Sequence, residues 1–220
     1  FTKTFPGHTA MNLRHLFLAA VFFILGGTAA EAAKEKPKPL FVPAAQQSLP
    51  AVPADKALIV FLEPINSIQG LFPVGLFEIE GDKRTLIATT GAHSKAAVLV
   101  TPGRHVFMAN HSGMIAHFLD ANVEAGKTYY VLLRFIYAQG FQLRPIRPTG
   151  PSDYSVANKK FPVWISKTVF VDKTADSDAF FENNKAAVIK TQTEGWAKWL
   201  AKTQEERDEL TLNPQDAISL

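Results

Sequence analysis

The chain has 220 residues, of which 47% are hydrophobic and 20% charged, and its formal net charge is +3 at pH 7. It contains no cysteine, which excludes disulfides, thiolate metal sites, a cysteine nucleophile and the acylated cysteine of a bacterial lipoprotein. The near balance of charge, without a basic block that alternates with aromatic residues, does not favour nucleic-acid binding.

The first segment is typical of secretory targeting. A short positive stretch follows Met11, an almost wholly apolar run covers residues 16–25, and small residues flank Glu31. This three-part layout predicts a signal peptide over 11–32 that is cleaved near Ala32, and therefore export to the periplasm. The alternative is a retained membrane anchor, although a spanning helix needs roughly 20 apolar residues.

Two short segments frame this signal. Residues 1–10 precede Met11, show no signal character and are left out of the fold. Residues 33–55 are rich in lysine and proline without a helical or strand period. Because proline fixes φ and has no amide donor, this composition predicts an extended linker.

A series of short apolar or alternating segments then predicts one domain over residues 56–148. Turn residues separate them, including Gly81-Asp82 in one hairpin and Ser112-Gly113 in another. Strands at this close spacing are typical of an antiparallel, immunoglobulin-like β-sandwich. The predicted strands are 57–62, 74–80, 84–90, 96–100, 105–111, 114–123, 128–137 and 141–147. The segment 128–137 is apolar on both faces, which predicts a central strand.

The last part, residues 149–220, is predicted to contain a loop, one further strand over "PVWISKTVFV" and a C-terminal α-helix from about Asp178, capped by Ser177 or Asp178. On this helix one apolar stripe comprises Phe181, Val188, Gln192, Trp196 and Trp199. Packing of this stripe on the sandwich is the favoured interpretation, and Gly195 should weaken the helix by about 1 kcal/mol.

Trp196 and Trp199 are also the candidate partner-binding residues, because an aromatic stripe on a helix can bind a partner protein. The lysines Lys190, Lys198 and Lys202 on the same helix add the alternative of contact with a membrane surface.

Two phrases in the strand-rich region carry a family resemblance. "VTPGRHVFMA" followed by "VEAGKTYYVLL" resembles the bacterial envelope family known as domain of unknown function 2846, and "KALIVFLEP" matches the first strand of that family. The resemblance covers residues 56–147. It implies a small exported β-sandwich and no catalytic residues. Many members look like lipoproteins, whereas this chain has no cysteine to acylate.

The histidines are the strongest candidates for reactive chemistry. A two-residue hairpin turn places His105 opposite Asp120, His111 about three residue pairs away, and His117 on the other face. This arrangement predicts a cross-strand pair and surface histidines, with no metal site. The alternative, a periplasmic metal-dependent or hydrolytic enzyme, needs His93, His105 and Asp120 to converge in a pocket.

Motifs for other enzyme classes are missing from the sequence, including the G-x-S-x-G elbow, the P-loop and G-x-G-x-x-G. The sequence therefore favours an exported, non-catalytic module without a cofactor. We expect it to bind a protein or an envelope polymer.

Overall fold

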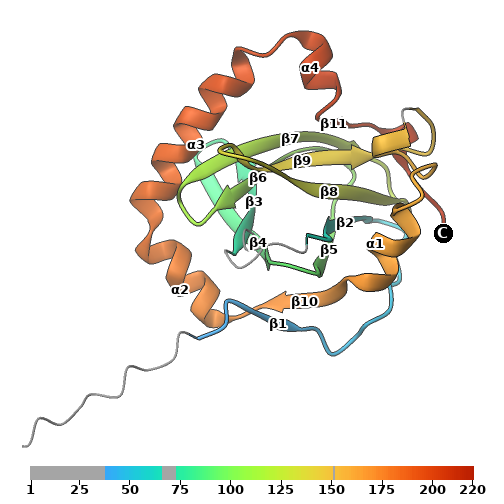
Figure 1. The fold of residues 1–220 in the computed structure, drawn as a ribbon, viewed down its shortest axis with the longest axis horizontal. Helices are drawn as coiled ribbons and strands as arrows, with labels where there is room; N and C mark the ends of the chain where they lie inside the picture. The colour runs from blue at the N-terminus through green and yellow to red at the C-terminus, as the bar shows by residue number, and fades with distance from the viewer. Residues whose placement is uncertain (1–37, 66–72, 151) are drawn as a thin grey trace, which may run out of the picture. The chain divides into compact units, whose positions relative to one another are not determined.

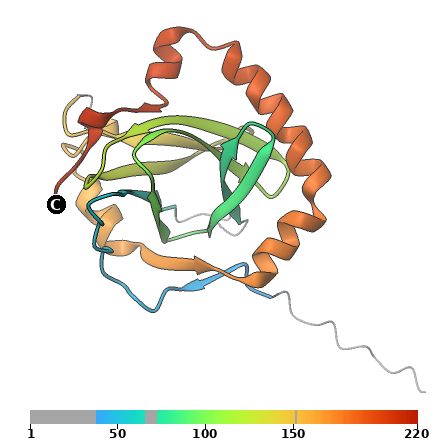
Figure 2. The same ribbon diagram turned by 180° about the vertical axis from the view of Figure 1, so that it is seen from behind.

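The computed structural model describes residues 38–65, 73–150 and 152–220. The predicted signal peptide, the residues before it and the first part of the predicted linker lie outside these ranges. Two β-sheets face each other in the described part, and helices lie against the outer side of each sheet (Figures 1 and 2). The prediction of a mainly β sandwich with a C-terminal helical extension is confirmed.

One sheet has six strands in the order β1-β10-β5-β2-β8-β9, and the other has five in the order β11-β7-β6-β3-β4. The bounds are β1 Phe41–Pro43, β2 Ala57–Glu63, β3 Val74–Glu80, β4 Lys83–Thr90, β5 Ser94–Val100, β6 Gly103–His111, β7 Ile115–Val123, β8 Thr128–Ile136, β9 Gly140–Ile146, β10 Val169–Lys173 and β11 Thr211–Leu212. The sheets are mixed, because β2–β8, β5–β10 and β7–β11 pair in parallel. The expectation of purely antiparallel sheets is corrected here, since hairpin turns specify only neighbours in sequence.

The core lies between the two sheets, and β8 shows how the alternation builds it. Tyr129, Val131 and Leu133 belong to the cluster between the sheets, whereas Tyr130 and Leu132 belong to a second cluster on the outer face of the six-stranded sheet. Because β8 lies between β2 and β9 and is buried on both faces, the predicted central strand is confirmed.

Helices cover both outer faces. Helix α1 (Phe161–Lys167) packs against the outer face of the six-stranded sheet through Phe161. Helices α2 (Ala175–Asn183) and α3 (Lys185–Leu200) lie along the five-stranded sheet and form one arc in both views (Figures 1 and 2). The ring of Phe181 lies so close to Gly75 that a Cβ atom there would stand 2.5 Å from Phe181 Cζ.

The described part of the predicted linker is not a free spacer. Strand β1 pairs with β10, and the side chain of Gln47 both donates to the Phe170 carbonyl and accepts from the Phe170 amide. Composition did not reveal this because the partner strand lies far along the chain. The domain therefore begins before residue 56.

The region after residue 149 also differs from the prediction. The segment predicted as one strand divides into α1 and the shorter strand β10. The predicted helix is two helices separated at Asn184, and Thr174, rather than Ser177 or Asp178, caps α2 by accepting a hydrogen bond from the Ser177 amide. Near the end of the chain Asn213 is the N-cap residue of a short 3-10 helix over Pro214–Asp216.

The C-terminal tail fastens the two sheets together. After helix α4 (Gln204–Asp208), β11 extends the five-stranded sheet beside β7. A few residues later, the Ile218 amide donates to the Thr128 carbonyl at the start of β8 in the other sheet, and the Ile218 side chain joins the outer cluster there.

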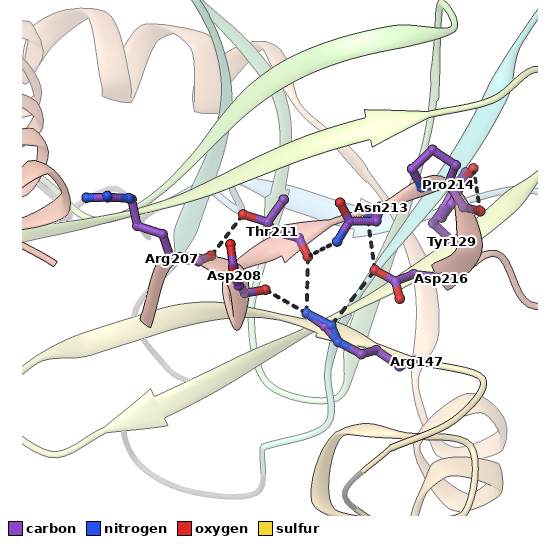
Figure 3. A network of polar contacts seen from close by, with 8 residues as sticks. All are labelled: Tyr129, Arg147, Arg207, Asp208, Thr211, Asn213, Pro214 and Asp216. Carbon is purple, nitrogen blue, oxygen red and sulfur yellow. Dashed lines mark hydrogen bonds and ion pairs between the residues drawn. The ribbon is translucent and has the colours of Figure 1, made fainter. Parts of the chain in front are cut away.

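Arg147, just after β9, holds this tail in place (Figure 3). Its Nη2 donates to the carbonyls of Asp208 at 2.8 Å and Thr211 at 3.2 Å, and its Nη1 lies 3.9 Å from the carboxylate of Asp216. Burial raises the pKa of Asp216, whereas the Asn213 amide and Arg147 act to lower it. The half-buried guanidinium of Arg147 thus contacts three oxygen atoms of the tail at once, and such charge-assisted contacts are strong.

Within the described residues, none of the helices is long and apolar enough to cross a membrane.

Candidate functional site

A groove of about 850 Å³ lies on the five-stranded sheet beside the second half of α3. Its apolar floor contains Ile79, Val106 and Phe118, all of which pack with the outer cluster of that sheet. Trp196 stands at the edge of this floor, so we call the hollow the Trp196 groove. Its volume falls within the range of about 300–1,000 Å³ that is usual for ligand sites.

The two helix tryptophans have different environments. Trp199 is buried at 8% exposure within the cluster between α3 and the sheet, whereas Trp196 is 38% exposed. The Trp196 ring meets the edge of Phe118 at 5.0 Å and stacks on Trp199 at 6.3 Å. Because Trp199 and Phe118 both pack against the Trp196 indole, a ligand can meet only the part of this ring that stays exposed.

Gly195 brings this part of α3 onto the sheet. A Cβ atom at Gly195 would stand 2.6 Å from the carbonyl oxygen of Ala116 in β7, which is too close for any larger residue without movement of the backbone. The glycine therefore gives the helix a close contact that offsets its poor helix propensity. Its position one residue before Trp196 fixes where the indole stands above the sheet.

One wall of the groove is acidic. Glu78, Glu80 and Asp82 come from the end of β3 and the turn that follows it. Glu80 forms an exposed pair with Lys83 at 3.2 Å, and such pairs are worth little in water. The Asp82 carboxylate has no ion pair or hydrogen bond with any part of the chain that the structure describes.

The cationic side chains of the groove are already engaged. Arg104 donates from Nε and Nη2 to the two carboxylate oxygens of Asp120 at 2.9 and 2.8 Å. His105 lies 2.5 Å from Glu78 through Nδ1 and 2.8 Å from the Thr101 carbonyl through Nε2. Each ring nitrogen of His105 therefore lies against an oxygen of the protein itself, Glu78 on one side and Thr101 on the other. Neither nitrogen is free to contact a ligand in this arrangement.

The predicted pair of His105 with Asp120 is wrong. The hairpin loop has three residues rather than two, because Ser112 and Gly113 both adopt positive φ and the strands close at His111 opposite Ile115. This one-residue change moves His105 opposite Ala121. Asp120 is therefore left to Arg104, and His105 to Glu78.

The remaining histidines lie elsewhere. His93 occupies the turn before β5 in the six-stranded sheet, and its carbonyl accepts from the Val169 amide. His117 faces the Gln139 carbonyl, and burial, with a smaller contribution from nearby lysines, lowers its pKa. Burial also lowers the pKa of His111, whose ring meets the edge of Phe141. Among the residues that the structure describes, no group of three His, Asp or Glu side chains could hold a metal ion.

A second polar feature lies inside the sandwich. Glu63 is the last residue of β2 and is 0% exposed. Because side chains alternate along a strand, Glu63 points to the same inward face as Ile59 and Phe61. Neither of its carboxyl oxygens, nor the Oγ1 of Thr90, makes a hydrogen bond to the described part of the chain. Burial raises the pKa of Glu63 to about 8, although Thr90 acts to lower it. The carboxyl is therefore protonated at neutral pH.

Sequence reasoning found only part of these features. It selected Trp196 as a candidate partner-binding residue and His105 as a candidate for reactive chemistry. The fold brings both residues to one groove. It did not select Asp82, Arg104 or Glu63. The signal for Glu63 was available, because the alternation 57, 59, 61 continues inward to 63.

No model of a known protein family matches the chain, and no curated protein matches it either. The resemblance to domain of unknown function 2846 therefore stays a prediction, based on the phrases at the start of β6 and β8. The function has to be argued from the geometry of the Trp196 groove.

Proposed function

We propose that the protein is an exported, non-catalytic envelope module that binds a partner protein or envelope polymer through the Trp196 groove. The exposure of Trp196 above an otherwise buried cluster is the observation that carries the proposal. A tryptophan at 38% exposure beside a buried neighbour leaves a large apolar surface in water, and such side chains are the usual anchors of binding sites. The floor beneath it belongs to a sheet and a docked helix, so the site is rigid before a ligand arrives.

The compartment in this proposal is supported by the signal-peptide pattern over residues 11–32. The resemblance to domain of unknown function 2846 supports the same compartment, since it implies an exported β-sandwich. Cleavage near Ala32 would leave the described sandwich in the periplasm.

The contacts within the groove support binding over catalysis. His105 has both nitrogens next to acceptors, and Asp120 faces Arg104. The enzyme alternative required these two side chains to converge with His93, which lies in the other sheet. What remains for that alternative is the pair of His105 and Glu78 at the groove.

Photo-crosslinking in cells that express the full chain tests the proposal. A photoreactive residue replaces Thr193 at the groove or, as the control, Tyr137, which is 85% exposed in the turn after β8. We expect one defined adduct from position 193 that is absent from position 137, and a mature N-terminus near residue 33. Equal adducts from both positions, or none from 193, would refute binding at the groove. An intact N-terminus in the inner membrane would refute export and favour an anchor.

A further inference from the structure

We propose that the ligand of the Trp196 groove is an extended basic peptide segment of a partner protein, with a lysine or arginine side chain held between the Trp196 indole and the acidic wall. This inference rests on the proposed function and names the chemistry of its ligand. Charge, aromatic geometry and the shape of the floor each support it.

The charge of the groove selects a cation. Glu80 and Asp82 face the groove. The basic residues beside them are Lys83, which pairs with Glu80, and Arg84, whose guanidinium donates to the Gln192 side chain and the Asp82 carbonyl rather than to a carboxylate. Arg104 pairs with Asp120 and His105 contacts Glu78, so neither of them pairs with Glu80 or Asp82. A positively charged side chain would therefore find at Asp82 a carboxylate that has no ion pair with the described residues, and it would be favoured over an anionic ligand at this wall.

The indole of Trp196 provides the second contact. A cation within about 6 Å of an aromatic face is attracted by the ring, and tryptophan gives the strongest attraction. The described part of the chain already contains three such contacts: Lys95 lies over Phe170 at 4.5 Å, and Arg144 and Arg134 lie over Tyr154 at 4.1 and 5.7 Å. Trp199 and Phe118 already pack against the Trp196 indole, so the part that stays exposed has room for a single side chain.

The apolar floor fits the stem of that side chain. Ile79, Val106 and Phe118 lie between the acidic wall and the tryptophan as parts of one hollow. Lysine and arginine pack their methylene groups on such surfaces while the charged head stays polar. A volume of about 850 Å³ holds more than one side chain, which favours a peptide segment over a single small cation.

Titration of the purified full chain with three defined probes tests the inference: an acetylated (Lys-Pro)₄ peptide, its (Glu-Pro)₄ counterpart and a neutral hexamer of N-acetylglucosamine. Binding is followed by calorimetry and tryptophan fluorescence. We expect the lysine peptide alone to bind, with affinity that falls as salt rises from about 0.05 to about 0.5 M. We expect Trp196→Leu and Asp82→Asn each to weaken binding by about tenfold. Because Asp82 lies in an exposed turn, the Asp82→Asn substitution should leave the fold intact. The Tyr137→Ala variant is the control and should bind the lysine peptide as tightly as the parent does.

The other outcomes overturn the inference in distinct ways. Tighter binding of the saccharide or the glutamate peptide, lost in Trp196→Leu, would show a groove with a different ligand class and would leave the proposed function standing. Lysine-peptide binding that is unchanged in both groove variants would place the peptide elsewhere. If no probe binds, the basic-peptide inference is refuted, and the crosslinking experiment decides the proposed function separately.

Discussion

Replacing Glu63 by glutamine should stabilise the protein at neutral pH and change the pH dependence of its stability. The side chain is fully buried between the sheets, and its pKa is raised from 4.5 to about 8. In the unfolded chain the same carboxyl ionises near its ordinary pKa. Between these two values the folded state holds one proton more than the unfolded state, so stability falls as pH rises from about 4.5 to about 8.

The size of the effect follows from the shift. Each pKa unit corresponds to about 1.4 kcal/mol, so Glu63 lowers the free energy of unfolding by about 3 kcal/mol at pH 7 and by about 5 kcal/mol above pH 8. Glutamine keeps the shape of the protonated carboxyl and cannot ionise. The Glu63→Gln variant should therefore match the parent near pH 4 and exceed it by about 3 kcal/mol at pH 7, which is roughly 6 to 12 °C in melting temperature.

Urea unfolding of the full chain at several pH values between about 4 and 9 measures this difference, since the range spans both pKa values. Glu124→Gln is the matched control, because Glu124 is exposed and its substitution should change stability by no more than about 0.5 kcal/mol at any pH. A difference between parent and Glu63→Gln that stays constant over this range would refute the reasoning. The reasoning would also be refuted if the free energy of unfolding of the parent rose between pH 5 and 8 in parallel with that of the variant.

Three further predictions concern the helix and the histidine. Trp199→Ala should lower the free energy of unfolding by about 3–5 kcal/mol, and Trp196→Ala by clearly less; equal losses in urea unfolding would contradict the docking of α3. Gly195→Ala should lower the free energy of unfolding by about 1–3 kcal/mol, because the new Cβ has no room against Ala116. Helix propensity alone would raise this free energy by about 1 kcal/mol, and such a gain would contradict the close contact. The purified full chain should contain no stoichiometric zinc by elemental analysis, with no change in His105→Ala; one equivalent lost in that variant would restore the metal-site alternative.

The strands of this protein were determined by its sequence, because the period of two and the turn residues are local properties. The predicted strand over 128–137 matches β8, and its two apolar faces placed it at the centre of a sheet. The hairpin at Gly81-Asp82 followed in the same way, because Gly81 adopts the positive φ that glycine tolerates.

Registers and distant pairings were decided only by the tertiary structure. A hairpin loop of three residues instead of two moved His105 away from Asp120, and a shift of one residue cannot be read from composition. The parallel pairing of β2 with β8 joins segments about 70 residues apart, and nothing local specifies it. For the same reason the strand β1 was taken for a linker.

The candidate site shows the same division. Sequence periodicity selected Trp196 as a residue on an apolar stripe, but periodicity cannot show how far a helix extends past the sheet that it covers. The close approach of Gly195 to Ala116 sets that position, leaving Trp199 buried and Trp196 at the groove. The charge of the groove was likewise decided by the tertiary structure. A charged side chain attracts or repels a ligand less when a neighbouring side chain of opposite charge pairs with it, and these neighbours come from other strands.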